Sequence, residues 1–147
     1  MTSPPVHVAL HLGGEDRDLA ALLDTRIHEF NVEATGQDDG RMLTIRAVDA
    51  AGALVAGLSG WTWGGCGYVD ALWVTSSHRG AGVGSRLLAA AEDEALTRGC
   101  AFMALSTHSF QAPEFYRRRG YVEVGSTPEY PKGHAQLHFR KDLAPAG

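Results

Sequence analysis

Cysteine is scarce in this sequence, and long hydrophobic runs are missing. The two cysteines, Cys66 and Cys100, form no CxxC pair and no regular framework, so we expect no structural disulfide. No stretch approaches the ~18 apolar residues that a membrane-spanning helix needs. The first residues, MTSPP, are not a basic segment followed by an apolar run, as a secretory signal would be. These absences predict a cytoplasmic protein with no membrane partner.

Runs of like charge and compact groups of metal ligands are also missing. The formal net charge is -4, and no run of five like charges occurs. Recognition of duplex DNA through its phosphates needs a concentrated positive surface, so we expect no nucleic-acid partner. The seven histidines are scattered, and none belongs to an HExxH motif or a similar spacing. The sequence therefore predicts no metal site.

The composition is that of an ordinary globular protein. Apolar residues make up 44% and charged residues 20% of the 147 residues, proportions that exclude a disordered or membrane-embedded chain. A chain of this length can bury roughly two thirds of its unfolded surface in one core. We therefore predict a single domain over residues 1–147.

The N-terminal part is predicted to form a strand and then a helix. Val6–Leu12 alternates in polarity and favours a strand, which Gly13 and Gly14 would end. Asp16 or Asp18 would then lie near the positive N-terminal end of a helix. Apolar residues at helical spacing mark that helix, and they are Leu19, Leu22, Leu23, Ile27 and Phe30. We expect them to form one buried stripe, followed by a loop or short irregular helix over residues 33–41.

The middle of the chain predicts a meander followed by a regular helix. Three strand-like runs cover residues 42–48, 54–63 and 68–74, and their turn chemistry favours antiparallel pairing. The period then becomes helical from Gly82 to Arg98, where the alanines favour helix and Gly99 is placed to end it. The apolar stripe of this helix is Leu87, Leu88, Ala91 and Ala95.

The C-terminal part adds short strands and a short helix. Strand candidates cover residues 102–107, 121–124 and 136–141. Pro113 suits the first turn of a helix that Gly120 would end. A strand–helix–strand step predicts that runs 68–74 and 102–107 are parallel. The whole pattern predicts an α+β, or mixed α/β, fold with a mostly antiparallel sheet.

A glycine-rich segment separates the third strand from the most regular helix. It reads Arg79-Gly80-Ala81-Gly82-Val83-Gly84-Ser85. Small residues let backbone N–H groups converge, the helix dipole adds partial positive charge, and Arg79 adds a full charge, so the segment suits a pyrophosphate. A P-loop would need GxxxxGK, and a dinucleotide fingerprint would need GxGxxG with an acid about 20 residues later; neither occurs. A simple tight turn remains the alternative.

Two motifs in this order resemble the GNAT family of N-acetyltransferases. Arg79–Gly84 is similar to the family's pyrophosphate loop, Q/R-x-x-G-x-G/A, and follows a strand as in that family. Ala112–Tyr121 resembles the family's A-x-x-F-Y-x-x-x-G-[FY] segment. The resemblance extends over residues 67–124. It implies an acyltransferase that moves the acetyl group of acetyl-CoA directly to a primary amine of a small molecule or peptide, and it allows a homodimer, since dimers are common in the family.

The resemblance also implies where acetyl-CoA, the cosubstrate, would bind. The central strands 68–74 and 102–107 would separate at one end, and the pantetheine arm would pair there with the backbone of Leu72–Val74. The residues so assigned to acetyl-CoA are Leu72, Trp73, Val74, Arg79, Gly80, Ala81, Gly82, Val83, Gly84, Ser85, Ser109 and Phe115. Ser109 departs from the family pattern, because many members have Asn there and a hydroxyl would have to replace its amide.

Acetyl transfer requires proton movements at both the amine and the sulfur. An alkylamine is almost fully protonated at pH 7, so it must lose a proton before attack. Tyr116 is the predicted general acid for the leaving thiolate, with simple packing as its alternative role. Asp70 is the predicted base, because period-2 alternation places it on the face of Leu72 and Val74. Asp70 could instead bind the substrate's ammonium or a structural network, and Glu33 is the competing base.

Other features keep more than one interpretation. The backbone N–H of Leu72 or Trp73 is the candidate donor to the oxyanion. The three arginines Arg117–Arg119 lie at a helix C-terminus, where the dipole favours cations, so they need not form a phosphate clamp. A non-catalytic acyl-CoA-binding regulatory module would retain the same glycine segment, and a longer acyl chain would require a deeper notch. A net negative protein tolerates a cationic acceptor.

Overall fold

The computed structural model describes residues 7–144 and divides into one unit that ends at Gly36 and another that begins at Gln37. The predicted first strand is wrong over residues 7–12, which have no regular secondary structure, and Val6 lies outside the described residues. Alternation alone does not make a strand, because an extended backbone needs a neighbouring strand for its hydrogen bonds. The described part of the first unit contains no such neighbour.

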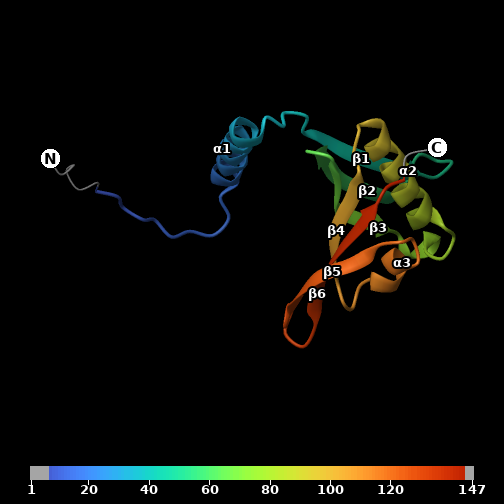
Figure 1. Ribbon diagram of the computed structural model, residues 1–147. Helices are drawn as coiled ribbons and strands as arrows, with labels where there is room; N and C mark the ends of the chain where they lie inside the picture. Colours follow the sequence, from blue (N-terminus) through green and yellow to red (C-terminus); the bar gives the residue numbers. More distant parts are fainter. Residues whose placement is uncertain (1–6, 145–147) are drawn as a thin grey trace. The chain divides into compact units, whose positions relative to one another are not determined.

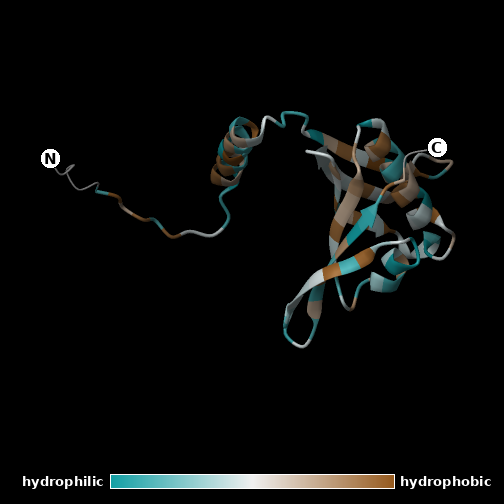
Figure 2. Ribbon diagram, viewed as in Figure 1, coloured by the Kyte–Doolittle hydropathy of each residue, from teal (hydrophilic) through white to brown (hydrophobic). Residues whose placement is uncertain are grey.

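Helix α1 (Arg17–Thr35) makes up the rest of the first unit. Asp16 caps it, since its Oδ1 accepts a hydrogen bond from the backbone N–H of Leu19 at 2.9 Å. Gly36 ends it in the left-handed region, with φ 74°. The predicted helix is confirmed, but its stripe is not buried: Phe30 is 69% exposed, and no residue of Arg17–Thr35 is buried. Figure 2 shows hydrophobic and hydrophilic residues side by side along α1.

The second unit is built on a six-stranded sheet in the order β1-β2-β3-β4-β6-β5 (Figure 1). The strands are β1 (Arg41–Val48), β2 (Leu54–Trp63), β3 (Cys66–Val74), β4 (Phe102–His108), β5 (Val122–Pro128) and β6 (Ala135–Asp142). Strands β3 and β4 are parallel, and the other neighbouring pairs are antiparallel. The structure therefore confirms the predicted α+β fold with a mostly antiparallel sheet.

Helix α2 (Val83–Thr97) connects β3 to β4 and packs on one face of this sheet (Figure 1). Its buried residues are those of the predicted stripe, Leu87, Leu88, Ala91 and Ala95. They join strand residues such as Val69, Met103 and Phe139 in one core cluster. The short helix α3 (Pro113–Arg117) contributes Tyr116 to the same cluster, and the 3₁₀ turn η1 (Ser76–His78) follows β3.

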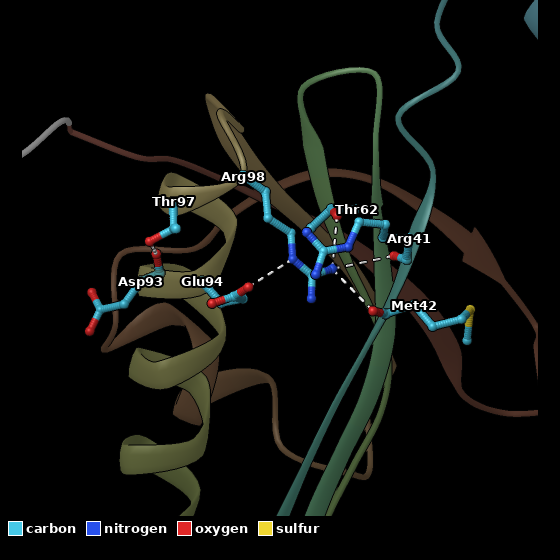
Figure 3. Close-up of polar contacts among 7 residues, drawn as sticks. All are labelled: Arg41, Met42, Thr62, Asp93, Glu94, Thr97 and Arg98. Atoms are coloured by element: carbon cyan, nitrogen blue, oxygen red, sulfur yellow. Dashed lines mark hydrogen bonds and ion pairs between the residues drawn. The ribbon is translucent and has the colours of Figure 1, made fainter.

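Arg98, just after α2, fastens the end of this helix to the sheet (Figure 3). Its Nη1 donates to the backbone oxygen of Met42 at 3.0 Å and to the hydroxyl of Thr62 at 3.1 Å. Its Nε pairs with the carboxylate of Glu94 at 2.9 Å. Thr62 is only 2% exposed, and a buried hydroxyl without a partner would cost about 1–3 kcal/mol. The network thus holds α2, and with it the glycine segment at the other end of the helix, in place over the sheet.

Strands β3 and β4 pair over only part of their length. Their Cα partners run from Cys66 and Phe102 to Val69 and Leu105, and no pair follows. Beyond that point β3 stays paired with β2, and β4 stays paired with β6. The two strands therefore separate toward their C-terminal ends, as the family resemblance implied, and the end of β3 keeps backbone groups without a strand partner on that side.

A bulge lies where the two strands begin to separate. The Cα partners of β2 and β3 step from Ser59 and Ala71 to Gly60 and Val69, which leaves Asp70 without a partner. Such an extra residue interrupts the alternation of side chains between the two faces of a strand. The bulge therefore changes which residues of β3 share a face.

Candidate functional site

A cavity of about 790 Å³ lies where β3 and β4 separate. Its walls come from the end of β3, from the glycine segment with the first turn of α2, and from α3 with the residues around it. The predicted acetyl-CoA residues that line it are Leu72, Trp73, Val74, Arg79, Gly80, Gly82, Val83, Gly84, Ser85 and Phe115, and the predicted acid Tyr116 lines it too. The structure thus brings most residues of two separate motifs to one cavity.

Three residues of the predicted site do not line this cavity. Ala81 is exposed in the turn before α2. The hydroxyl of Ser109 accepts a hydrogen bond from the backbone N–H of Ala135 at 3.1 Å, at the start of β6. Asp70 is exposed at the bulge, whereas Leu72 and Val74 line the cavity. The alternation argument that placed Asp70 on their face does not hold across a bulge.

The glycine segment has a backbone conformation that positions the start of α2 beside the cavity. Gly80 and Gly82 have φ angles of 79° and 81°, in the left-handed region where a Cβ atom is strained. Gly82 is the N-cap of α2. The first N–H groups of a helix have no carbonyl partner within it and carry the positive end of its dipole. The cavity is therefore lined by a helix N-terminus suited to an anionic group.

Close packing fixes the position of this segment. A Cβ atom at Gly84 would lie 3.3 Å from Cζ of Phe115, so the two helices approach each other at a point that favours glycine. Arg79 is held at the other end, since its Nε donates to the backbone oxygen of Val74 at 3.0 Å. Both contacts join the segment to another wall of the same cavity.

Tyr116 combines burial with access to the cavity. Its residue is 8% exposed, and its ring makes edge contacts with Phe115 and Tyr121. Burial raises the pKa of the Tyr116 phenol above its ordinary value. Its hydroxyl has no hydrogen-bond partner among residues 7–144, and the residue is part of the cavity wall. The phenol therefore stays protonated at neutral pH and is available to donate a proton to a group in the cavity.

Four further residues that the sequence argument did not assign also line the cavity, namely His78, Gln111, Ala112 and Arg119. Arg119 donates from Nε to the hydroxyl of Ser85 at 2.6 Å, and its guanidinium lies 3.9 Å from the centre of the Phe115 ring. Arg119 lies just after α3, and the signal for it was the run Arg117–Arg119, which the sequence argument explained by the helix dipole. Gln111 accepts a hydrogen bond from the backbone N–H of His108 at 2.7 Å, in a turn that no motif predicts.

The described residues offer no sign of a metal centre or of a reactive thiol. Within residues 7–144, no group of three or more His, Cys, Asp or Glu side chains could hold a metal ion. No helix in this part of the chain is long and apolar enough to cross a membrane. Cys66 and Cys100 are free thiols, and desolvation raises the pKa of both, which disfavours the nucleophilic thiolate at neutral pH.

Comparisons with known proteins agree with this geometry. The model of the acetyltransferase (GNAT) family matches residues 15–121. The chain is 44% identical over 112 residues to a blasticidin-S acetyltransferase of Streptomyces morookaense, a match that covers 71% of this chain and 80% of that protein.

Solved structures show the same fold. A crystal structure of an acetyltransferase from Bacillus cereus ATCC 14579 superposes with a TM-score of 0.78 and 31% identity, covering 91% of this chain and 98% of that one. A structure from Bacillus anthracis str. Ames, described as a streptothricin acetyltransferase in complex with acetyl coenzyme A, has a TM-score of 0.63 and 19% identity. It covers 70% of this chain and 63% of that chain, and this likeness shows the fold alone.

Proposed function

Because the chain belongs to the GNAT family of acetyltransferases, we propose that it transfers the acetyl group of acetyl-CoA directly to a primary amine of a small molecule. The family makes the protein an acyltransferase. The observation that carries the finer proposal is the cavity at the separation of β3 and β4, because the glycine segment and Tyr116 line it together.

The walls of the cavity suggest how the donor lies. Its pyrophosphate would sit against the glycine segment, where the helix N-terminus and Arg79 supply positive charge. Its pantetheine arm would follow the open edge of β3 and pair with the backbone of Leu72–Val74, in the manner of an added strand. This placement directs the thioester toward the wall that contains Tyr116.

The transfer then needs one bond made, one bond broken, two protons removed from the acceptor nitrogen and one proton delivered to sulfur. The amine nitrogen bonds to the carbonyl carbon of the thioester, and the C–S bond breaks when the tetrahedral intermediate collapses. We assign the oxyanion to the backbone N–H of Leu72 or Trp73, and the proton that the thiolate receives to Tyr116. The ammonium loses one proton to solvent before attack, and the nitrogen loses a second as the intermediate collapses, with Asp70 on the same strand as the proposed acceptor of that second proton by way of water. The Tyr116 phenolate regains its proton from solvent.

The proposed class of acceptor is argued from a related protein. The 44% identical protein of Streptomyces morookaense is a blasticidin-S acetyltransferase, so blasticidin S is the first acceptor to test. The net charge of -4 also tolerates a cationic acceptor. A panel of other small primary amines, with a lysine-containing peptide for contrast, would define the acceptor class.

The test is release of the CoA thiol from acetyl-CoA in the presence of these amines. We expect release by the wild-type protein and a loss of about 10²-fold or more in kcat for Tyr116→Phe, because the phenol proton is missing. Since the ring is kept, the KM for acetyl-CoA should change by no more than about twofold.

Tyr121→Phe is the matched control. Tyr121 is also buried, but its hydroxyl donates to Glu92 at 2.7 Å and does not line the cavity, so this variant should keep its kcat. Full kcat in Tyr116→Phe would remove the acid role from Tyr116. Binding of acetyl-CoA without thiol release for any amine would contradict the proposed transfer itself.

A further inference from the structure

A hydrogen-bonded chain of three side chains joins β4, β6 and β5. The hydroxyl of Ser106 on β4 lies 2.8 Å from Nδ1 of His138 on β6, and Nε2 of the same ring lies 3.3 Å from the hydroxyl of Thr127 on β5. A neutral imidazole with its proton on Nε2 satisfies both contacts, since it donates to Thr127 and accepts from Ser106. Such a ring can take up a proton that arrives through the Ser106 hydroxyl.

Ser106 is the first residue of β4 beyond the pairing with β3. The last pair of these two strands joins Val69 to Leu105. Ser106 therefore lies where the gap between the strands begins, at the level of the bulge residue Asp70, which follows Val69. Ser106 and His138 are half-buried, and neither lines the donor cavity of 790 Å³. This pair thus borders the gap without belonging to the site described above.

The side chain of Ser106 and the donor cavity lie on opposite faces of the sheet. Leu105 belongs to the core cluster that packs against α2. Thr107 is buried, and its hydroxyl donates to Oε1 of Gln111, which lines the donor cavity. Side chains alternate along a strand, so Ser106, between these two residues, points to the face away from α2. With the donor in the cavity, an amine would reach the thioester from this other face, through the gap beside Ser106.

We propose that Ser106 and His138 carry away the proton that the acceptor ammonium loses before attack. The inference rests on the proposed function, which places the pantetheine arm and its thioester along the gap. The ammonium gives one proton to Oγ of Ser106 while the hydroxyl proton of Ser106 passes to Nδ1 of His138. The amine becomes neutral and the imidazole becomes an imidazolium. The imidazolium then releases one proton to solvent, which returns the pair to its neutral state.

The charged groups around His138 determine which variants the test needs. On β6 itself, Arg140 is two positions away and pairs with Asp142 at 2.9 Å. Across the gap, β3 provides Asp70. On β4, His108 is two positions after Ser106 and is a second imidazole on the same face. The residues of β5 opposite His138 are uncharged, namely Gly125 and Thr127. The titration of His138 therefore has to be distinguished from that of His108.

The test is the pH profile of kcat, measured by release of the CoA thiol at saturating acetyl-CoA and amine. We expect the wild-type kcat to fall as pH drops through about 8 to 5, where imidazoles gain charge, because an imidazolium cannot accept the proton. His138→Gln should lower kcat at pH 7 by about 10²-fold. Its kcat should also keep rising above pH 8, toward the ordinary amine pKa of about 10, since the ammonium then loses its proton to water alone.

Two substitutions at Ser106 separate the relay from simple packing. Ser106→Ala removes the hydroxyl and should change kcat and its pH profile in the same way as His138→Gln. Ser106→Thr keeps the hydroxyl and should keep both the kcat and the acidic limb of the wild-type protein. The KM for acetyl-CoA should change by no more than about twofold in all three variants, because neither residue lines the donor cavity. If His138→Gln does not fold, the two Ser106 variants still decide the question.

His108→Gln is the matched control, and it should keep the acidic limb. Loss of the limb in His108→Gln, or an unchanged limb in His138→Gln or Ser106→Ala, would overturn the relay. Turnover by the wild-type protein would leave the proposed function intact in each of these cases. If the wild-type protein released no CoA with any amine, the proposed function would fail and this inference with it.

Discussion

The two halves of β3 differ in what lies on their β4 side. Residues Cys66–Val69 pair with β2 on one side and with β4 on the other, and Val69 is 4% exposed. The following residues, Asp70–Val74, have no partner in β4, and Trp73 is 56% exposed. The first half of β3 therefore packs in the core, and residues of its second half line the cavity.

This difference shows how one strand serves both stability and binding. Backbone groups paired on both sides have no capacity left for a ligand, whereas an open edge can accept an extended chain. The second half of β3 stays extended because β2 still holds it. Arg98 and the core hold α2 across the sheet, so the glycine segment stays close to this open edge.

The largest expected effect comes from a substitution that crowds the bulge between the two halves of β3. A Cβ atom at Gly60 would lie 1.9 Å from the backbone oxygen of Tyr68, and a backbone cannot move away cheaply. We expect Gly60→Ala to lower the free energy of unfolding by about 3 kcal/mol or more. Urea denaturation followed by circular dichroism measures this loss.

Gly57→Ala on the same strand is the control for that experiment. A Cβ atom at Gly57 would lie 3.5 Å from the backbone oxygen of Ile45, an ordinary contact, so the loss should stay below about 1 kcal/mol. Equal stabilities of the two alanine variants would show that the bulge does not depend on a glycine at position 60.

A smaller effect distinguishes a glycine that lines the cavity from a glycine with the same backbone conformation elsewhere in the fold. Gly82 (φ 81°) and Gly52 (φ 84°) share a left-handed backbone, and a Cβ atom would meet nothing within 4 Å at either position. Alanine at either position should therefore lower the free energy of unfolding by about 1–2 kcal/mol. Only Gly82→Ala should also weaken acetyl-CoA binding, by about tenfold, since Gly82 lines the cavity and caps α2. Similar binding losses in both variants, measured by titration calorimetry, would mean that general destabilisation is the cause.

The last effect is absent at neutral pH and concerns Tyr116, at the cavity, and Tyr121, in the core. Burial raises the pKa of Tyr116, and burial together with the Glu92 carboxylate raises that of Tyr121. A phenol whose pKa is higher in the folded state contributes stability that is complete below its unfolded pKa, about 10, and is lost as pH rises above it. Unfolding free energies should thus fall above pH 10, by up to about 1.4 kcal/mol per tyrosine and pH unit. Tyr121→Phe should reduce the slope of the unfolding free energy against pH. An unchanged slope would contradict the raised pKa assigned to Tyr121.

The sequence predicted those features that depend on short-range patterns. Helical spacing located α1 and α2, and the family resemblance carried by the glycine segment and the Phe115–Tyr116 motif implied a site where the structure has the cavity. Spacing did not predict what a stripe packs against: the stripe of α2 is buried, whereas that of α1 is exposed. A helix requires only its own residues, but burial requires a partner surface that periodicity does not specify.

The sequence did not predict the features that depend on residues far apart along the chain. The face on which Asp70 lies depends on the register between β2 and β3, and Ser109 is engaged by Ala135 from another strand. Arg119 joins the site through Ser85, which lies 34 positions earlier in the chain. Each of these follows from pairing or packing that forms only when the sheet is assembled.

The central claim is that the open half of β3 binds the acyl donor, and hydrogen exchange tests it directly. Amide exchange followed by mass spectrometry would be compared with and without acetyl-CoA in peptides that cover Cys66–Val69 and Leu72–Val74. We predict that acetyl-CoA slows exchange at Leu72–Val74 by about tenfold or more and leaves Cys66–Val69 unchanged, because the first half is already paired on both sides. Unchanged exchange at Leu72–Val74 under saturating acetyl-CoA would contradict the account.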